Sequence, residues 1–232
     1  MDEETSQQLE RIRKAYDTTV EQYKRGIDPM AALPLEFRTS PDFKEFLGNA
    51  RGCGSANPDI KDYLSPQAGM RFLDAGCSAN LASYGFDKWP SVYYGVDISP
   101  ALIEAMRKYA HDKGVSVGGL FLADVSSMPF DNDFFDIAMM IGVLEYCSLP
   151  YVKDALGELS RILRPNSRLA LDIPNPEHKH YSLMVRLEEY LGRPHIGFSR
   201  KSFEETAREF FKTERVDDSR VMIKYFVKSI KK

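Results

Sequence analysis

Short apolar runs in the middle of the chain end three times on an aspartate, at Asp74, Asp97 and Asp124. In an open α/β sheet, ligands lie beyond the carboxyl ends of the strands, where such residues gather. A carboxylate in the position of Asp97 can accept hydrogen bonds from both hydroxyls of a ribose, and such charge-assisted bonds are about twice as strong as neutral ones. Asp124, next to Val125, is placed to accept from an exocyclic amine while apolar neighbours sandwich the ring. Together these residues predict an adenosine site.

A turn of small residues, Ala75-Gly76-Cys77-Ser78, follows the first aspartate, and a helix is expected to open near Asn80. Strand, tight turn and helix in this order direct free backbone N–H groups at a ligand. The turn residues must be small because ligand and backbone approach closely there. Each aspartate also has a structural interpretation. Asp74 can cap the following helix, Asp97 can interact with a helix dipole, and Asp124 can be a solvated loop carboxylate.

From residue 70 onward, apolar runs alternate with amphipathic helices. A helix is expected from the cap Ser99-Pro100 to about Lys113, and another over residues 152–163, closed by Pro165. Near-continuous apolar strands between such helices imply an α/β fold with a doubly wound, mainly parallel sheet. The predicted strands are Arg71–Asp74, Val92–Val96, Leu120–Ala123, Phe135–Ile141 and Arg168–Ile173.

The C-terminal part begins with a polar, His- and Pro-rich segment over residues 175–199. A helix follows, for which Ser202 and Glu205 form a capping box. Two strands, residues 212–216 and 222–230, are predicted to add an antiparallel extension to the sheet. The buried side of the helix is predicted to consist of Phe203, Ala207, Phe210 and Phe211.

The N-terminal part reads as a helical cap. Residues 3–24 form one amphipathic helix with an apolar stripe. Residues 25–65 are irregular, with short helices near residues 42–47 and 58–63. We therefore expect a cap or extension over residues 1–65 and a ligand-binding domain over residues 66–232. Residues 175–199 form an insert that caps the substrate. The stripe of the first helix consists of Leu9, Ile12, Tyr16, Val20 and Tyr23.

Composition bounds the class of protein. A net charge of −3 and a pI near 5.9 argue against a nucleic-acid partner, which calls for a basic patch. No apolar run reaches about 18 residues, and the acidic N-terminus does not resemble a targeting segment, so neither a membrane span nor secretion is expected. Three separated cysteines, Cys53, Cys77 and Cys147, indicate a reduced, cytoplasmic setting. Packing cysteines are favoured over a soft-metal or arsenic trap.

Four motifs in order, RFLDAGCSAN, YYGVDISPALIEAMRKYA, FLADVSSMPFDNDFFDIAMMIGVLEY and ELSRILRPNSRLAL, resemble the class I S-adenosylmethionine (SAM)-dependent methyltransferases. The similarity is to the small-molecule group called the type 11 methyltransferase domain and covers residues 70–175. It implies SAM as cofactor, with Gly76 beside the methionine moiety and Ile141 and Gly142 on the methyl side. The segment from Tyr16 to Tyr23 looks like the helix that folds over the cofactor. The implied cofactor-binding set is Asp74, Ala75, Gly76, Cys77, Asp97, Ile98, Asp124, Val125, Ile141, Gly142, Tyr16 and Tyr23.

The glycine turn departs from the family pattern D-x-G-x-G-x-G. Gly76 is kept, whereas Ser78 and Asn80 occupy the other two glycine positions. Asn tolerates a left-handed backbone better than most residues, so Asn80 is expected to let the turn form. Ser78 adds a side chain where the cofactor comes close. A SAM- or nucleoside-binding protein of the same fold without turnover is therefore the alternative function. A nicotinamide-dependent dehydrogenase would need G-x-G-x-x-G here, which the chain lacks.

Catalytic residues are not identified by any dyad in the sequence. The candidates for a general base or substrate contact are Glu145, after the fourth strand, and three histidines of the insert, His178, His180 and His195. Glu145 can equally be a surface charge. No metal site is expected, because no carboxylate or thiol stands at ligand spacing from these histidines. The favoured function is methyl transfer from SAM to a small-molecule acceptor, whose identity and whose O, N, S or C nucleophile the sequence does not name.

Overall fold

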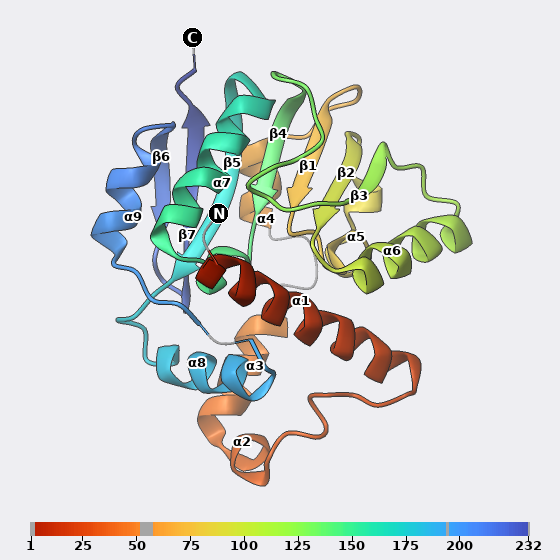
Figure 1. The fold of residues 1–232 in the computed structure, drawn as a ribbon, viewed down its shortest axis with the longest axis vertical. Coiled ribbons are helices and arrows are strands. Elements are labelled where there is room, and N and C mark those ends of the chain that lie inside the picture. Colours follow the sequence, from red (N-terminus) through yellow and green to blue (C-terminus); the bar gives the residue numbers. More distant parts are fainter. Residues whose placement is uncertain (1–2, 52–57, 194, 232) are drawn as a thin grey trace.

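The computed structural model describes residues 3–51, 58–193 and 195–231. Its centre is a seven-stranded sheet of order β3-β2-β1-β4-β5-β7-β6 (Figure 1). The five strands from β3 to β5 pair in parallel, and β7 runs antiparallel to both β5 and β6. The predicted doubly wound, mainly parallel sheet with an antiparallel strand near the C-terminus is confirmed. The strands are β1 Arg71–Ala75, β2 Val92–Asp97, β3 Gly119–Leu122, β4 Phe135–Met140, β5 Leu163–Pro174, β6 Phe211–Asp217 and β7 Met222–Ser229.

Helices cover both faces of the sheet because alternate strand residues point to opposite sides. Leu73 packs into the core beneath α7 and α9, whereas its neighbour Phe72 packs into the core beneath α4, α5 and α6. Each core is apolar and contiguous, so the sheet is shielded on both sides. The helices of these layers are α4 Pro58–Leu64, α5 Asn80–Ser83, α6 Pro100–Lys113, α7 Leu149–Ile162 and α9 Arg200–Ala207.

The strand order reverses between β1 and β4. Chain connections lead from β1 to β2 and β3 on one side, and from β4 to β5 on the other. The carboxyl ends of β1 and β4 therefore diverge into loops that leave in opposite directions. This is the place where open α/β sheets bind ligands.

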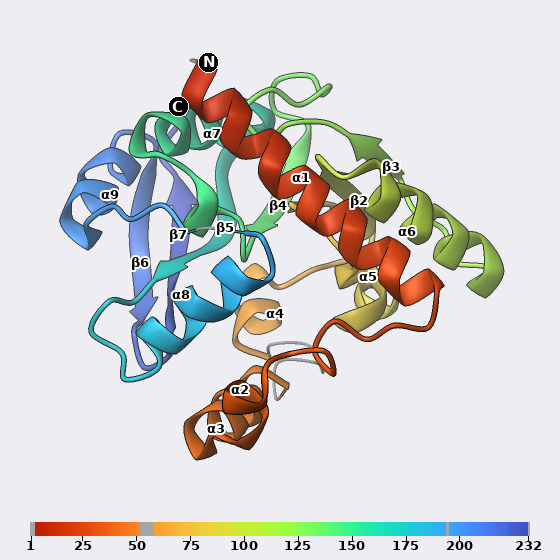
Figure 2. The ribbon, with the colours of Figure 1, turned by 60° about the horizontal axis from the view of Figure 1, so that its bottom comes forward.

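The longest helix, α1 (Glu3–Lys24), lies across the carboxyl edge of the sheet, from the side of α7 to that of α6 (Figure 2). Below it, α2 (Leu35–Thr39), α3 (Pro41–Arg51) and α8 (Tyr181–Tyr190) share a small apolar cluster. The predicted first helix and the two short helices before β1 are confirmed, and α2 was missed. Two short 3₁₀ turns, η1 (Phe86–Lys88) and η2 (Leu144–Tyr146), complete the elements.

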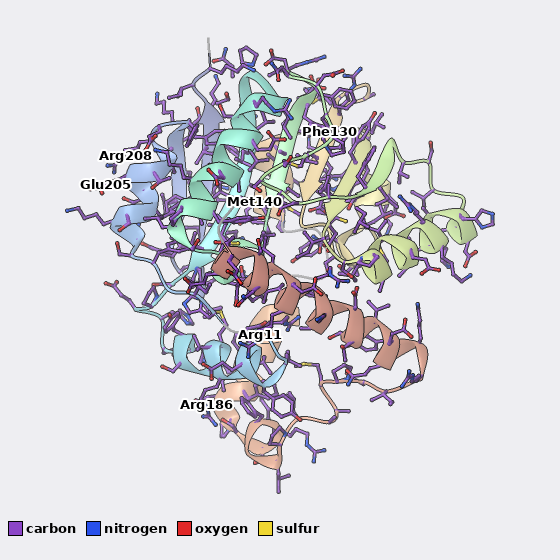
Figure 3. All side chains as sticks on the ribbon, viewed as in Figure 1. Arg11, Phe130, Met140, Arg186, Glu205 and Arg208 are labelled. Atoms are coloured by element: carbon purple, nitrogen blue, oxygen red, sulfur yellow. The ribbon has the colours of Figure 1, made fainter. Side chains whose placement is uncertain are left out.

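The opposite edge of the sheet is closed by aromatic packing. Phe130 stands at this edge, far from Arg11 of α1 (Figure 3). Its ring contacts those of Phe121, Phe134 and Phe135 at centroid distances of 4.9, 5.6 and 4.7 Å. These rings pack together at the amino edge, on the side away from α1. Within the described residues, no helix combines the length and the apolar character needed to cross a membrane.

Two details of the predicted C-terminal half differ from the structure. The helix α7 ends at Ile162, because Leu163 already pairs with Phe135 of β4 as the first residue of β5. Pro165 therefore lies in an exposed irregularity of the strand. The polar segment after Pro174 contains a helix, α8, with Met184 and Leu187 on its buried side.

The predicted capping box of α9 is also wrong. The helix begins three residues earlier, where the Ser199 side chain accepts a hydrogen bond from the Ser202 N–H at 3.0 Å. It ends at Ala207, so Phe210 lies in the following turn and Phe211 opens β6. Serine recurs three residues apart in this segment, and the first serine, not the second, has the extended backbone of a cap.

Candidate functional site

A cavity of about 250 Å³ lies at the carboxyl ends of β1 and β4, beneath α1. Its lining comes from six regions of the chain: α1, the turn after β1 together with α5, the end of β2, the loop after β3, the segment after β4 and the start of α7. Seven residues of the predicted cofactor set line it, namely Tyr16, Gly76, Asp97, Ile98, Val125, Ile141 and Gly142. The other five residues of that set lie elsewhere.

The turn after β1 requires glycine at position 76. Gly76 has φ +76°, and a β-carbon there would lie 2.2 Å from Cγ2 of Val143. The turn folds back onto β2, since the N–H groups of Gly76 and Cys77 both donate to the Val96 carbonyl at 2.8 Å. Glycine therefore allows the backbone at position 76 to line the cavity directly, because a side chain there would collide with Val143.

Ser78 and Asp97 meet at the centre of the turn. Ser78 has the left-handed backbone, with φ +40°, and its N–H donates to Asp97 Oδ2 at 2.9 Å. Asn80 instead begins α5 in helical conformation. The prediction that Asn80 supplies the left-handed residue is therefore wrong: Ser78 does, and the Asp97 carboxylate holds it.

Asp97 is 7% exposed and lines the cavity. Its second oxygen, Oδ1, accepts from the Ser99 N–H at 2.9 Å. Burial raises the pKa of this carboxyl, and the two N–H donors oppose that shift. Each carboxylate oxygen has two lone-pair sites, so the carboxylate keeps acceptor capacity for a further donor. The side chain both fixes the turn and offers acceptors to the cavity.

Asp74 supports the turn from below. It is fully buried and accepts hydrogen bonds from the Tyr93 hydroxyl at 2.8 Å and from the Asn80 amide at 3.4 Å. Burial raises its pKa to about 7. Its neighbours Ala75 and Cys77 are also fully buried, beneath the turn and outside the cavity lining. Asp74 thus ties the first turn of α5 to β1 and β2.

Asp124 lines a neighbouring surface pocket. One of its oxygens accepts from the N–H and the hydroxyl of Ser126, each at 2.8 Å, and from the Tyr151 hydroxyl at 2.5 Å. The next residue, Val125, is buried and does line the cavity, as does Tyr151. The structure therefore brings the apolar member of this pair to the cavity and uses the carboxylate to orient a tyrosine of its wall.

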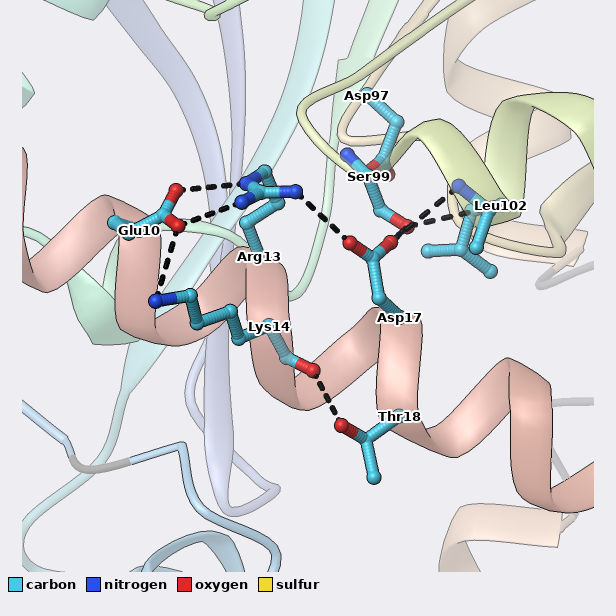
Figure 4. Close-up of polar contacts among 9 residues, drawn as sticks. Glu10, Arg13, Lys14, Asp17, Thr18, Asp97, Ser99 and Leu102 are labelled. Carbon is cyan, nitrogen blue, oxygen red and sulfur yellow. Dashed lines mark hydrogen bonds and ion pairs between the residues drawn. The ribbon is translucent and has the colours of Figure 1, made fainter.

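A polar latch holds α1 over the cavity (Figure 4). Asp17 accepts from the Ser99 hydroxyl at 2.5 Å and from the Ala101 N–H at 3.3 Å, at the start of α6. The Ser99 hydroxyl in turn accepts from the Leu102 N–H at 3.1 Å, as an N-cap. Arg13 bridges Asp17 and Glu10 along the helix. The latch fixes Leu9, Ile12 and Tyr16 as the roof, whereas Tyr23, two turns beyond Tyr16, is 55% exposed and lies outside the cavity lining.

A buried polar wall beside the roof escaped the sequence analysis. The Tyr16 and Tyr146 hydroxyls are 3.4 Å apart, and Tyr146 donates to Glu188 at 2.8 Å. Arg193 pairs with Glu188 at 2.7 Å and lies over the Tyr16 ring, 4.8 Å from its centroid. Burial raises the pKa of Tyr16 to about 12 and that of Tyr146 well above its usual value, so both phenols are neutral at neutral pH.

Two buried carboxyls lie behind the segment after β4. Asp172 of β5 accepts from the Gly142 N–H at 2.8 Å, which holds Gly142 at φ +71°. Glu145 is 8% exposed, and its Oε2 is buried with no hydrogen-bond partner among the described residues. Burial and mutual repulsion raise the pKa of Glu145, and burial raises that of Asp172. The sequence does contain a signal for Asp172, because an acidic residue inside the apolar run LALDIP is unusual for a buried strand.

The three candidate histidines occupy different places. His195 is bonded through both ring nitrogens, Nδ1 to the Glu145 carbonyl at 2.8 Å and Nε2 to the Tyr181 hydroxyl at 2.9 Å. His178 lines a separate polar surface pocket. His180 is buried against α3, on the side of Glu45. None of the three belongs to the described lining of the cavity, and His195 acts by holding the Glu145 segment.

Of the cysteines, Cys147 lines the cavity and Cys77 is buried beneath the turn. Burial raises the pKa of both thiols, so they are protonated packing groups. Cys53 lies outside the described residues.

Taken as a whole, the strand order, the switch-point cavity and the Gly76 turn define the fold of the class I SAM-dependent methyltransferases. Residues 73–171 match the methyltransferase domain family, which leaves α1 to α4 and every element after β5 outside the match. Over residues 73–171 the chain is therefore similar to the methyltransferase domain family, in line with the fold.

Two curated relatives and one solved structure illustrate the similarity. A phthiotriol/phenolphthiotriol dimycocerosates methyltransferase of Mycobacterium leprae is 30% identical over 154 residues, which cover 66% of this chain and 52% of the relative. A tRNA (carboxymethyluridine(34)-5-O)-methyltransferase of Arabidopsis thaliana is 30% identical over 178 residues, 72% of this chain and 41% of the relative. The chain thus spans about half the length of the curated relatives it matches, or less.

The solved structure is that of geranyl diphosphate C-methyltransferase from Streptomyces coelicolor A3(2), in complex with Mg²⁺, geranyl diphosphate and S-adenosyl-L-homocysteine. It superposes with a TM-score of 0.61 at 15% identity and covers 74% of this chain and 77% of its own. At that identity, the likeness shows the fold alone.

Proposed function

We propose that the chain binds SAM in the cavity beneath α1 and transfers its methyl group to a small-molecule acceptor. The observation that carries this proposal is the position of Asp97. Its carboxylate lines the cavity and, with two lone-pair sites on each oxygen, keeps acceptor capacity beyond its backbone donors, which suits the hydroxyls of a ribose. The apolar residues Ile98 and Val125 stand beside it and suit the faces of the adenine ring.

The remaining lining fits the rest of the cofactor. The Gly76 turn gives a floor without a side chain, and Gly142 gives a second point of close approach after β4. When bound, SAM supplies an electrophilic methyl carbon on a sulfonium. The protein must then hold an acceptor atom in line with it and exclude water, and positioning of this kind contributes on the order of 7–11 kcal/mol.

The acceptor has a place beside the cofactor cavity. A second pocket of about 220 Å³ lies beneath the N-terminal turns of α1 and shares Leu9, Tyr146, Cys147 and Tyr151 with the first. Its far wall is Ile196 of the insert, whose N–H donates to the Glu145 carbonyl at 2.9 Å. Helix α1 and Ile196 of the insert therefore border a recess of mixed character, in which Leu9, Pro150 and Ile196 are apolar and Glu4, Thr5 and Gln8 are polar, and this favours a compact acceptor with an apolar part.

We propose Glu145 as the candidate base, although it belongs to the lining of neither pocket. It adjoins Tyr146, which lines both pockets, and its unpaired carboxyl oxygen is buried. Burial raises the pKa of Glu145 to about 8, so its ionised form is a stronger base than an exposed glutamate and prevails above that pH. His195 and Ile196 fix its backbone through the Glu145 carbonyl, and the Tyr146 hydroxyl, whose proton goes to Glu188, can accept a hydrogen bond from the acceptor molecule.

The test is a binding measurement followed by a turnover measurement. Thermal unfolding is recorded with SAM, S-adenosylhomocysteine and NAD, and we expect a rise in Tm with the first two alone. Ligand at about 100 times its Kd stabilises by roughly 2.7 kcal/mol, which is a shift of several degrees for a chain of this size. Release of S-adenosylhomocysteine is then measured with a panel of apolar hydroxy, amino and carbon acids, and separately with tRNA.

Turnover of a small molecule supports the proposal in full. Turnover with tRNA alone contradicts the small-molecule acceptor, and SAM binding without any turnover favours the non-catalytic alternative. Stabilisation by NAD instead of SAM overturns the cofactor assignment.

A further inference from the structure

A histidine and two carboxylates from distant parts of the chain lie together where α3 packs against α8. Asp42 and Glu45 stand in the first turns of α3, three residues apart and therefore on one face. His180 occupies the position before the first residue of α8. One ligand atom from each of the three lies within 4.8 Å of the other two. The proposed methyl transfer uses none of these side chains.

Apolar packing fixes this cluster. Phe43 on α3 and Leu187 on α8 belong to one buried cluster with Leu33 and Phe37. The ring of Phe46 meets that of His180 edge-on at a centroid distance of 6.1 Å. The two helices are therefore held in contact by side chains adjacent to the polar groups, and the imidazole is placed independently of the carboxylates.

His180 is the unusual member of the cluster. Its side chain is 3% exposed, and Nε2 is buried with no hydrogen-bond partner among the described residues. The nearest acidic atom is Glu45 Oε2, at 3.6 Å, beyond hydrogen-bond length. Buried polar atoms without a partner are costly and uncommon, so this nitrogen calls for one. It faces two carboxylates, which points to a cation between them.

We propose that Asp42, Glu45 and His180 bind a divalent transition-metal cation of the zinc type. Imidazole nitrogen with carboxylate oxygens is a donor set that such ions take, whereas Mg²⁺ and Ca²⁺ prefer oxygen ligands throughout. Both carboxylates are exposed, so water can complete the coordination. Lys179 pairs with Glu45 through the other oxygen, Oε1, at 2.6 Å, and so leaves Oε2 for the ion.

The site ties the N-terminal segment to the insert. A bound ion joins residues 42 and 45 to residue 180, and α8 leads directly to His195 and Ile196 beside the acceptor pocket. The ion is a structural clamp on α8, outside the cofactor cavity. This inference does not depend on the identity of the methyl acceptor.

The experiment uses the full chain after treatment with a chelator and dialysis. Zn²⁺ is titrated calorimetrically, and thermal unfolding is recorded with Zn²⁺ and with Mg²⁺. We expect one Zn²⁺ per chain, a rise in Tm of several degrees with Zn²⁺, and little change with Mg²⁺. The variants His180→Gln and Asp42→Asn should each weaken Zn²⁺ binding by about tenfold or more. Asp42 is exposed, so its variant tests the site without threatening the fold.

The matched control is His111→Gln, which removes an exposed histidine beside a carboxylate, Asp112, on α6. It should leave the affinity for Zn²⁺ unchanged. Absence of stoichiometric Zn²⁺ binding by the wild-type chain overturns the proposal, as does binding that survives in both ligand variants. The SAM-induced shift in Tm is measured on the same samples, so failure of the metal site is distinguishable from failure of the cofactor assignment.

Discussion

Replacing Asp97 by asparagine separates the two roles of this carboxylate. In the folded protein it accepts the N–H of Ser78 and that of Ser99, each at 2.9 Å, and it lines the cofactor cavity. Asparagine keeps one acceptor oxygen and replaces the other by an NH₂ group, which cannot accept. One of the two backbone bonds is therefore lost, as is one acceptor site offered to a ribose.

The two losses have different magnitudes and different readouts. An unsatisfied buried donor costs about 1–3 kcal/mol of stability, which for this chain lowers Tm by roughly 2–12 °C without ligand. A hydrogen bond to a charged group contributes about 1.5–3 kcal/mol, so the affinity for SAM should fall by about ten- to 150-fold. Thermal unfolding measures the first quantity and calorimetric titration measures the second, under conditions where the variant is fully folded.

The control is Asp124→Asn. Asp124 also follows a strand and also accepts a backbone N–H, but it lines the neighbouring pocket. We expect this variant to lose stability and to change the affinity for SAM by less than Asp97→Asn does. If Asp97→Asn lowers Tm and leaves the affinity for SAM unchanged, the carboxylate serves the turn alone and the assignment of the ribose site is refuted.

Four further changes test the surroundings of the cavity. Gly76→Ala combines a left-handed backbone with a clash against Val143, and it should lower the free energy of unfolding by about 2–5 kcal/mol. A second change, Val143→Ala, should restore part of this loss in thermal unfolding. An unchanged Tm in Gly76→Ala contradicts the close approach. Ser78→Gly removes the cost of a left-handed backbone at serine, about 1–2 kcal/mol, and adds about 0.5–1 kcal/mol for the greater conformational entropy that glycine loses on folding. The Tm should therefore stay the same or rise. A fall in Tm argues against strain at this residue. Asp17→Ala removes the hydrogen bonds from Ser99 and Ala101 that hold α1 to the start of α6. Amide hydrogen exchange in residues 3–24 should then become faster, and SAM should bind more weakly. Unchanged exchange would show that apolar contacts alone hold α1. The pKa of Glu145 is higher in the folded chain than in the unfolded chain, so the folded chain holds a proton that the unfolded chain has lost, and stability falls as the pH rises above about 4.5. Glu145→Gln cannot ionise. In thermal unfolding followed across pH, this variant should therefore lose less stability over that range.

The sheet and its helices were predictable from the sequence because their signals are local. Buried parallel strands are short apolar runs, and the helices between them carry apolar stripes, so each element can be recognised alone. The cap of α6 is equally local: Ser99-Pro100 predicted its start, and the structure shows the Ser99 side chain bonded to the Leu102 N–H. The order of the aspartates along the chain then predicted which strand ends meet at the cavity.

The errors lie where a local pattern has two solutions or where partners are distant. Ser199 and Ser202 both resemble caps, and the backbone entering α9 decides between them. Asp124 and Val125 are neighbours, and which one faces the cavity depends on Tyr151, which binds the carboxylate from α7. The wall of Tyr146, Glu188 and Arg193 joins η2 to the end of α8. No spacing in the sequence reports such a contact.

The altered glycine turn does not by itself favour the non-catalytic alternative. A left-handed serine costs about 1–2 kcal/mol, but the Ser78 N–H bonds to the Asp97 carboxylate, and a bond to a charged acceptor contributes about 1.5–3 kcal/mol. The second contribution offsets the first, so the turn keeps its shape without the second glycine of the family pattern. The same bond leaves Asp97 with acceptor capacity beyond its backbone donors, so the loss of glycine and the binding of a ribose are compatible.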